Sequence, residues 1–210
     1  GANTRSRIEI RGTPEGEKVI IDGYVNVTGR NSRPIPDGKG GYFIEKIRAG
    51  TFERALQKAK KVSVLLNHDW NKNLGDTDSN LTLKEDCIGL RAHMETSDPE
   101  IVKKAKEQKL RGWSFRFFTP TEVRADKESG IPVREITDMQ MDEVSLIDER
   151  MRPWYPSTTV EARAGEDGEV TYEIRAEEME PEYVTETTKK KEKPDHSKLK
   201  EMIEKYGGNV

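Results

Sequence analysis

Short runs of apolar and β-branched residues, separated by glycine, proline and other turn-forming residues, recur along the first 165 residues of the chain. Such runs are typical of β-strands. Residues 62–66 are apolar except for one serine, so they predict a buried strand, which ends at Asn67-His68-Asp69. Further strands are expected at 19–27, 42–47, 81–85, 88–95, 112–117 and 158–161. Two more are expected within residues 131–147, the second of them at 143–147.

Three segments have the residue spacing of short amphipathic helices. The first is predicted to start with Thr51 as its N-cap and to continue to about Lys60. The second is predicted to start at Ser97-Asp98-Pro99-Glu100, because this sequence combines a capping side chain with a proline in the first turn. It should end near Leu110. A third helix is expected at 197–206 in the tail.

The many short strands and few helices predict an α+β, mainly β fold. We expect a small closed or nearly closed β-barrel flanked by a few helices rather than a parallel α/β sheet. Apolar clusters are almost missing after residue 164, where the chain is acidic and then basic. Residues 1–164 are therefore expected to form one domain, and residues 165–210 a charged, flexible extension.

Composition limits the classes of partner. Charged residues make up 36% of the chain, both signs are mixed and the formal net charge is −3, which does not favour nucleic acid as a partner. No run approaches the roughly 20 apolar residues that a transmembrane helix needs, so no membrane association is expected. Cys87 is the single cysteine, which excludes an internal disulfide and fits a reducing cytoplasm.

The chain has three histidines, and their settings differ. His196 lies in the charged tail without apolar neighbours. His93 lies within a predicted strand and is interpreted as an ordinary residue of a solvent-facing or dimer surface. His68 follows a buried strand, at a position where a rigid scaffold can hold a catalytic group. The alternative for His68 is a loop residue at the strand end.

Motifs for metals, phosphates and reactive thiols are missing. The sequence contains neither His-Glu-x-x-His nor Cys-x-x-Cys. Cys87 has no cationic setting that would activate it. Residues 38–41 lack the spacing of a phosphate-binding loop, so no metal or organic cofactor is expected. Ser114 is a candidate nucleophile, because it is a small hydroxyl residue between aromatic residues, just after Gly112.

Several short motifs, in this order, resemble the prohead proteases of tailed phages over residues 20–163. They are the segment 41–52, Asn67-His68-Asp69, Leu74-Gly75, the segment 81–90, Ser114-Phe115 with Phe117, Asp142-Glu143-Val144-Ser145-Leu146 and Tyr155-Pro156. Each motif is short, and the series as a whole carries the resemblance.

The resemblance implies a fold similar to that of the herpesvirus maturation proteases, a β-barrel ringed by helices that usually works as a dimer. It also implies a serine nucleophile and a histidine base, which correspond here to Ser114 and His68. A serine hydroxyl needs such a base to take its proton during attack. The herpesvirus enzymes use a second histidine after the serine. Here the next histidine is His196 in the tail, so the third member must differ.

Glu143 is the expected third member, because a buried carboxylate beside His68 would stabilise the imidazolium. Strand alternation alone does not separate Glu143 from a solvent-facing residue, and Asp142 and Asp69 remain alternatives. Related viral enzymes use loop arginines in oxyanion stabilisation.

The corresponding loop contains Arg150 and Arg152, which are candidates for that role. Arg116 stands where a small residue is usual in the serine motif and is expected to affect the charge of the substrate pocket.

The resemblance thus implies a serine endopeptidase that forms an acyl-enzyme without a cofactor. Its expected substrates are scaffold segments, major capsid protein precursors and the protease itself, inside the assembling prohead in the host cytoplasm. The extension after residue 164 is either scaffold-directed or self-removed, or a plain terminus. Two rival hypotheses are a non-catalytic scaffold-binding assembly factor with the same fold and an unrelated β-barrel binding module.

Overall fold

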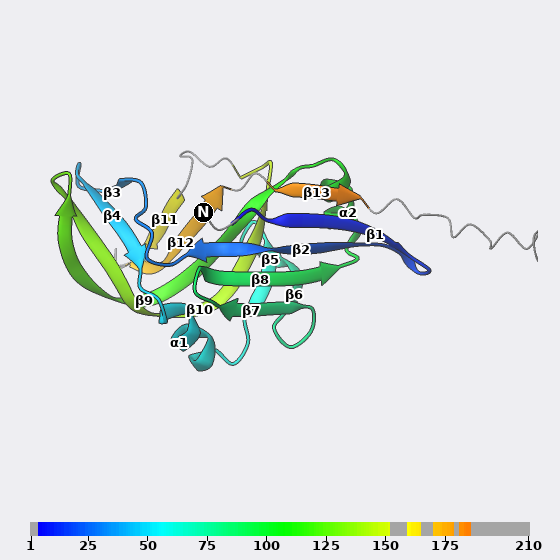
Figure 1. The fold of residues 1–210 in the computed structure, drawn as a ribbon, viewed down its shortest axis with the longest axis horizontal. Coiled ribbons are helices and arrows are strands. Elements are labelled where there is room, and N and C mark those ends of the chain that lie inside the picture. The colour runs from blue at the N-terminus through cyan, green and yellow to red at the C-terminus, as the bar shows by residue number, and fades with distance from the viewer. Residues whose placement is uncertain (1–3, 152–158, 165–169, 179–180, 186–210) are drawn as a thin grey trace, which may run out of the picture.

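The computed structural model describes residues 4–151, 159–164, 170–178 and 181–185. They form two β-sheets and two helices (Figure 1). The predicted mainly β class with flanking helices is therefore confirmed. Neither sheet closes on itself among the described strands, so the barrel remains a prediction.

The smaller sheet has five strands in the order β13-β1-β2-β8-β7. All neighbours are antiparallel except β13, which pairs with β1 in parallel. In chain order its strands are β1 (Arg7–Thr13), β2 (Gly16–Val27), β7 (Leu81–Glu85), β8 (Gly89–Thr96) and β13 (Glu182–Thr185).

The larger sheet has the order β11-β12-β9-β10-β4-β3, and β5 joins it through β10 while β6 pairs with β5. Its strands are β3 (Ile35–Pro36), β4 (Tyr42–Ile47), β5 (Ser63–Leu66), β6 (Asp69–Asp76), β9 (Leu110–Glu128), β10 (Ile131–Asp148), β11 (Thr159–Ala164) and β12 (Val170–Glu178). The long β9–β10 hairpin curves from the left edge of Figure 1 into the middle of the molecule. Its turn residues Ser129 and Gly130 both have positive φ, as in the two-residue turns that suit the twist of a hairpin.

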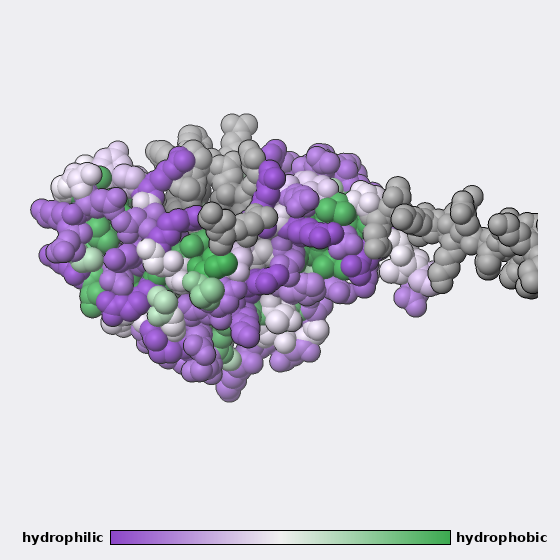
Figure 2. Space-filling model, in the orientation of Figure 1, coloured by the Kyte–Doolittle hydropathy of each residue, from purple (hydrophilic) through white to green (hydrophobic). Residues whose placement is uncertain are grey.

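One buried cluster joins the two sheets and both helices. Strand β9 contributes Trp113, Phe115 and Phe117 on one face, each fully buried. Burial of aromatic side chains of this size is a large favourable term in folding. Hydrophilic residues dominate the face of the molecule in Figure 2, with smaller apolar patches between them, in keeping with the high share of charged residues.

The two helices begin in different ways. Helix α2 (Pro99–Lys106) has the predicted N-cap, because the Asp98 carboxylate accepts hydrogen bonds from the amides of Glu100 and Ile101. For helix α1 (Thr51–Lys58) the predicted cap was wrong, since Gly50 occupies the N-cap position without a side-chain bond. The Glu85 carboxylate instead accepts hydrogen bonds from the amides of Gly50 and Glu53. Neither helix has the length and apolar surface to cross a bilayer.

Part of the expected extension forms strands. Residues 170–178 are β12, which pairs with β9, and residues 182–185 are β13, which pairs with β1. The Tyr183 hydroxyl donates a hydrogen bond to the Leu110 carbonyl at 2.7 Å, which fastens β13 to the domain. The helix predicted at 197–206 lies outside the described residues. The division of the chain at residue 164 remains a prediction.

Candidate active site

Strand β10 organises the site because it has β5 on one side and β9 on the other. It runs parallel to β5, with Glu143 opposite Ser63. It runs antiparallel to β9, with Ser145 opposite Ser114. This pairing brings Ser114 on β9 close to Glu143 from one side and the end of β5, which leads into His68, close to it from the other.

His68 is held by a tight turn between β5 and β6. Asn67 and His68 have φ values of 54° and 59°, in the left-handed region that few residues other than glycine adopt readily. The Asn67 amide group donates to Asp148 at 2.8 Å, and the Asp148 backbone amide donates back to Asn67 Oδ1 at 3.0 Å. This reciprocal pair fixes the turn and thereby the direction of the imidazole.

Three side chains form a continuous polar chain. His68 Nε2 lies 2.7 Å from Ser114 Oγ, and His68 Nδ1 lies 2.5 Å from Glu143 Oε1. A serine, a histidine and a carboxylate linked in this order form the arrangement that serine hydrolases use for nucleophilic attack. Ser114 and Glu143 are fully buried, and the His68 side chain is 9% exposed.

Ser145 is a fourth member of this chain, and it was missed from the sequence. Its hydroxyl donates to Glu143 Oε2 at 2.7 Å and accepts a hydrogen bond from the His68 backbone amide at 3.0 Å. Both carboxylate oxygens of Glu143 therefore have a partner, which a buried charge requires. The available signal was strand alternation, which puts Glu143 and Ser145 on the same face of β10.

The other two acidic candidates lie in different contacts. Asp142 binds the Arg116 guanidinium through both oxygens, at 2.5 and 3.1 Å. Asp69 accepts a hydrogen bond from the Asn71 amide at the start of β6. Glu143 is the carboxylate that contacts the imidazole.

Arg116 lies beside this polar chain, and its charge is already neutralised by Asp142. Its guanidinium is also 3.9 Å from Glu143 Oε1. Burial opposes its charge, yet the hydrogen bond to Asp142 keeps the Arg116 pKa above its usual value. Three aromatic rings surround this guanidinium at 5.0–5.3 Å: those of Trp70, Phe118 and Tyr172.

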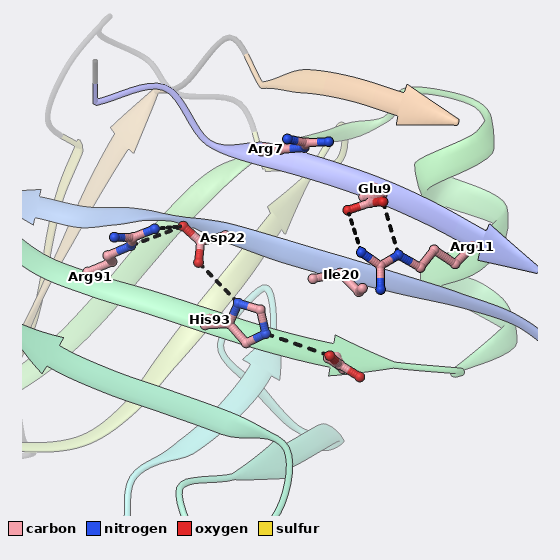
Figure 3. Close-up of a pocket in the computed structure, with 8 residues that line it drawn as sticks. Arg7, Glu9, Arg11, Ile20, Asp22, Arg91 and His93 are labelled. Atoms are coloured by element: carbon pink, nitrogen blue, oxygen red, sulfur yellow. Dashed lines mark hydrogen bonds and ion pairs between the residues drawn. The ribbon is translucent and has the colours of Figure 1, made fainter. Parts of the chain in front are cut away.

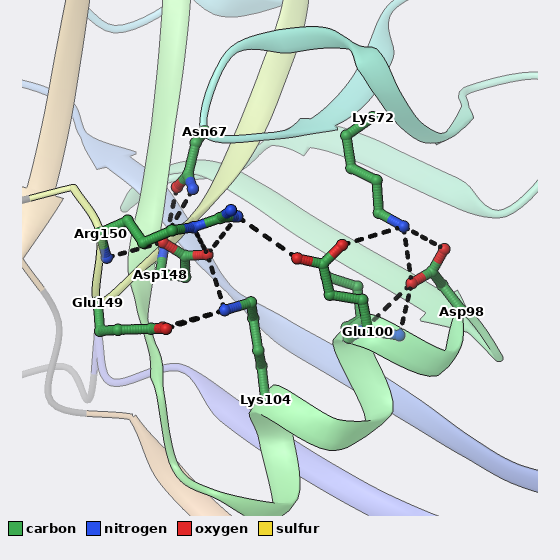
Figure 4. A network of polar contacts seen from close by, with 9 residues as sticks. Asn67, Lys72, Asp98, Glu100, Lys104, Asp148, Glu149 and Arg150 are labelled. Carbon is green, nitrogen blue, oxygen red and sulfur yellow. Dashed lines mark hydrogen bonds and ion pairs between the residues drawn. The ribbon is translucent and has the colours of Figure 1, made fainter.

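Of the two loop arginines expected to stabilise the oxyanion, the structure describes Arg150. Arg150 binds Asp148 at 2.7 Å and lies 3.5 Å from Glu100, so its guanidinium belongs to an ionic network behind the His68 turn (Figure 4). Burial alone would raise the Asp148 pKa, but hydrogen bonds from Arg150, Asn67 and Lys104 hold it far below its usual value. Arg152 lies outside the described residues.

A second group of ionisable residues lies on the smaller sheet. A hollow of about 640 Å³ over β1, β2 and β8 contains His93, which is 3.0 Å from Asp22 (Figure 3). Its lining includes none of Ser114, His68 and Glu143. Within the described parts of the chain no group of histidine, cysteine and acidic residues has the arrangement of a metal site, and Cys87 is an exposed free thiol.

Comparison with known families places this geometry in context. The family model of the caudovirus prohead serine proteases (Peptidase_S78) matches residues 6–174. Comparisons with curated proteins and with solved structures gave no match. The family match extends over most of the chain and includes all three residues of the polar chain. The protein therefore belongs to the caudovirus prohead serine protease family.

Proposed function

We propose that the protein is a serine endopeptidase in which Ser114 is the nucleophile, His68 the general base and Glu143 the residue that orients His68. The observation that carries the proposal is the chain of contacts from Ser114 Oγ through the imidazole to Glu143 Oε1, at 2.7 and 2.5 Å. Family membership supports the same activity.

The chemistry follows from which atoms hold protons. With the Nδ1 proton of His68 directed to Glu143, Nε2 is free to accept the Ser114 hydroxyl proton as Oγ attacks a peptide carbonyl. The resulting imidazolium then gives its proton to the leaving amine, and water releases the acyl group by the same route. No metal or organic cofactor has a role in these steps.

Glu143 is suited to stabilise the imidazolium that forms during each transfer. It is fully buried, where an opposite charge acts more strongly than in water. Ser145 holds its second oxygen and so limits its rotation. The buried pair therefore favours one orientation of His68, with Nε2 toward the nucleophile.

The proposed substrates are scaffold segments and precursors of the major capsid protein, with self-processing in addition. The family supports an action within the assembling capsid in the host cytoplasm. A homodimer is the proposed working form, by analogy with the related viral fold. A non-catalytic assembly factor is not favoured, because scaffold binding requires no buried serine–histidine–glutamate contact.

The decisive experiment incubates the purified full-length protein with its scaffold and capsid precursors and follows cleavage by mass spectrometry. Ser114→Ala and His68→Ala should abolish cleavage. Ser97→Ala changes an exposed serine and should leave it intact. Fragments that also appear with Ser114→Ala would exclude this serine as the nucleophile.

A further inference from the structure

Strand β12 lies along the nucleophile as an added antiparallel strand. It pairs with β9 from Glu173 opposite Phe117 to Glu178 opposite Gly112, and Ala176 is opposite Ser114. The Ser114 hydroxyl donates a hydrogen bond to the Arg175 carbonyl oxygen at 2.8 Å. Proteins often bind extended peptides by adding a strand to a sheet edge in this way.

Its position limits access to the nucleophile. Ser114 is fully buried in this state, so another polypeptide cannot reach its hydroxyl until β12 moves. Among the described strands β11 pairs with β12 alone, so β11 and β12 form the edge of the larger sheet next to β9. Within the proposed endopeptidase, β12 therefore occupies the place of a substrate.

We propose that β12 is a bound substrate segment, that Arg175–Ala176 is a self-cleavage site, and that Glu45 selects arginine on the acyl side of the scissile bond. This proposal rests on the endopeptidase function above and specifies its substrate class. The evidence comes from the Arg175 side chain and from the Arg175 carbonyl.

The Arg175 side chain fills a closed, acidic pocket. It is 1% exposed, and two of its nitrogens, Nε and Nη2, bind the two oxygens of Glu45, each at 2.7 Å. Nη2 also donates to Glu173 at 2.6 Å, and the guanidinium lies 5.0 Å from the Phe117 ring centroid. Burial opposes the charge of Arg175, but Glu45 and Glu173 keep its pKa above the usual value.

The pocket is built for a guanidinium rather than for any cation. A two-pronged contact with a carboxylate matches the planar fork of arginine and not the single ammonium of lysine. Glu45 also lies 3.4 Å from Arg134, so it keeps a cationic partner when β12 leaves. The pocket can therefore be vacated and filled again by the arginine of another substrate.

The Arg175 carbonyl also explains how the bound strand is held uncut. The Ser114 hydroxyl has one proton and two acceptors, His68 Nε2 at 2.7 Å and the Arg175 carbonyl at 2.8 Å. While the proton points to the carbonyl, His68 cannot remove it. Cleavage requires the proton to turn to His68 and the carbonyl oxygen to leave the hydroxyl.

The proposed cleavage of the Arg175–Ala176 bond follows the acyl-enzyme route. Ser114 Oγ bonds to the Arg175 carbonyl carbon, and its proton passes to His68 Nε2. The bond from Arg175 to the Ala176 nitrogen breaks as His68 returns that proton to the new amine. Water hydrolyses the Arg175 ester, which leaves a carboxylate on residue 175 and restores Ser114.

The residue pattern at the proposed cleavage site recurs elsewhere in the chain, and these copies provide internal controls. The order Glu-x-Arg-Ala occurs at 173–176 and again at 122–125 and 161–164. The copy at 122–125 lies within β9, where Arg124 is opposite Arg134 of the hairpin. Cleavage at Arg175 without cleavage at Arg124 would thus show that placement beside Ser114, in addition to sequence, selects the bond.

The first test follows the purified full-length chain by intact mass and by sequencing of new N-termini. We expect fragments 1–175 and 176–210, with Ala176 as the new N-terminus, and no cleavage with Ser114→Ala. Arg175→Gln should slow this cut by on the order of 10- to 100-fold, since a charge-assisted hydrogen-bond pair is lost. The matched control Arg124→Gln should be cut like the wild type.

The second test adds peptides to the full-length protein, and it does not depend on the folding of the Arg175 variant. The probe has the sequence of residues 170–178, and its partner has glutamine in place of the arginine. We expect the arginine peptide to be cleaved at least 10-fold faster. Glu45→Gln should remove this preference, whereas the control Glu135→Gln, which removes a carboxylate bound to Arg48, should keep it.

The outcomes separate this proposal from the proposed function. Cleavage that depends on Ser114 but occurs at other bonds, or without preference for arginine, would overturn the assignment of Arg175 and Glu45 and leave the endopeptidase intact. If no substrate were cleaved, including the capsid and scaffold precursors, the proposed endopeptidase function would be overturned, and this proposal with it.

Discussion

The Ser145 hydroxyl donates a hydrogen bond to Glu143 Oε2 at 2.7 Å, on the carboxylate oxygen that does not face His68. The same hydroxyl accepts a hydrogen bond from the His68 backbone amide at 3.0 Å. Ser145 thus contacts both the base and its carboxylate partner without reaching the nucleophile. In the proposed mechanism Ser145 is a positioning residue, which fixes the orientation of the proposed base His68 and its carboxylate partner Glu143.

Ser145→Ala is therefore expected to lower kcat by roughly 10-fold, because a buried hydrogen bond of about 1–2 kcal/mol is lost. KM should change little, since Ser145 does not face a bound peptide. Steady-state kinetics on a cleaved peptide would measure both constants. Ser145→Thr keeps the hydroxyl and should recover part of the rate, whereas an equal rise in KM would indicate a general loss of structure.

Glu143→Gln should have a larger effect on the same reaction. Glutamine keeps the shape but lacks the charge that favours the imidazolium, so we expect kcat to fall on the order of 10²- to 10⁴-fold. Asp142→Asn is the matched control, because Asp142 binds Arg116 and not His68. If Asp142→Asn were the more damaging change, the order of these two carboxylates in the mechanism would have to be reversed.

Local sequence patterns and the family resemblance singled out Ser114, His68 and Glu143, and the structure brings these three side chains into contact, whereas their role in catalysis remains a proposal. His68 follows a recognisable buried strand, and the motif series identified Ser114. The choice of Glu143 over Asp142 and Asp69 depends on the β9–β10 register, in which Ser145 is opposite Ser114. Such a register is non-local and cannot be derived from alternation within one strand.

Strand β12, which pairs with β9 beside Ser114, was not predicted from the sequence, for a related reason. Residues after 164 are highly charged, and charged segments were interpreted as solvated. Arg175 is nevertheless buried because Glu45, which lies 130 positions earlier in the sequence, supplies a partner for its charge. Composition alone does not reveal such a pairing, since it depends on which distant segment carries the opposite charge.

Tyr24 is expected to ionise at a higher pH than an ordinary tyrosine. Burial and its hydrogen bond to Asp86, at 2.6 Å, raise the pKa of Tyr24 to about 12. The raised value means that Tyr24 contributes stability below pH 10, the unfolded pKa, and that this contribution is lost as pH rises through about 12. Tyrosinate absorbance should show a late component, and Tyr24→Phe should reduce that component by one tyrosine; burial also raises the pKa of Tyr183, which should remain in it. Ionisation of all tyrosines near pH 10 in folded protein would contradict this expectation.

The Asp148 network supports the turn that carries His68. Asp148 is fully buried and binds Asn67, Lys104 and Arg150. Its partners hold the Asp148 pKa far below the ordinary value of about 3.9. A carboxyl group with a depressed folded-state pKa contributes stability above its unfolded pKa and loses that contribution as pH falls through the folded value.

Asp148→Asn should therefore lower the free energy of unfolding by about 3 kcal/mol at neutral pH, because the buried Lys104 loses one of its two carboxylate partners and Asn67 loses a charged acceptor. The difference in the free energy of unfolding between wild type and variant should have its full value above about pH 5 and should shrink progressively as pH falls below 4. Urea unfolding at several pH values from 3 to 7 would measure it. Glu149→Gln removes a more exposed carboxylate from the same Lys104 and should cost less than about 1 kcal/mol. A loss for Asp148→Asn that stayed constant with pH would show that the shape of the side chain, and not its charge, stabilises the His68 turn.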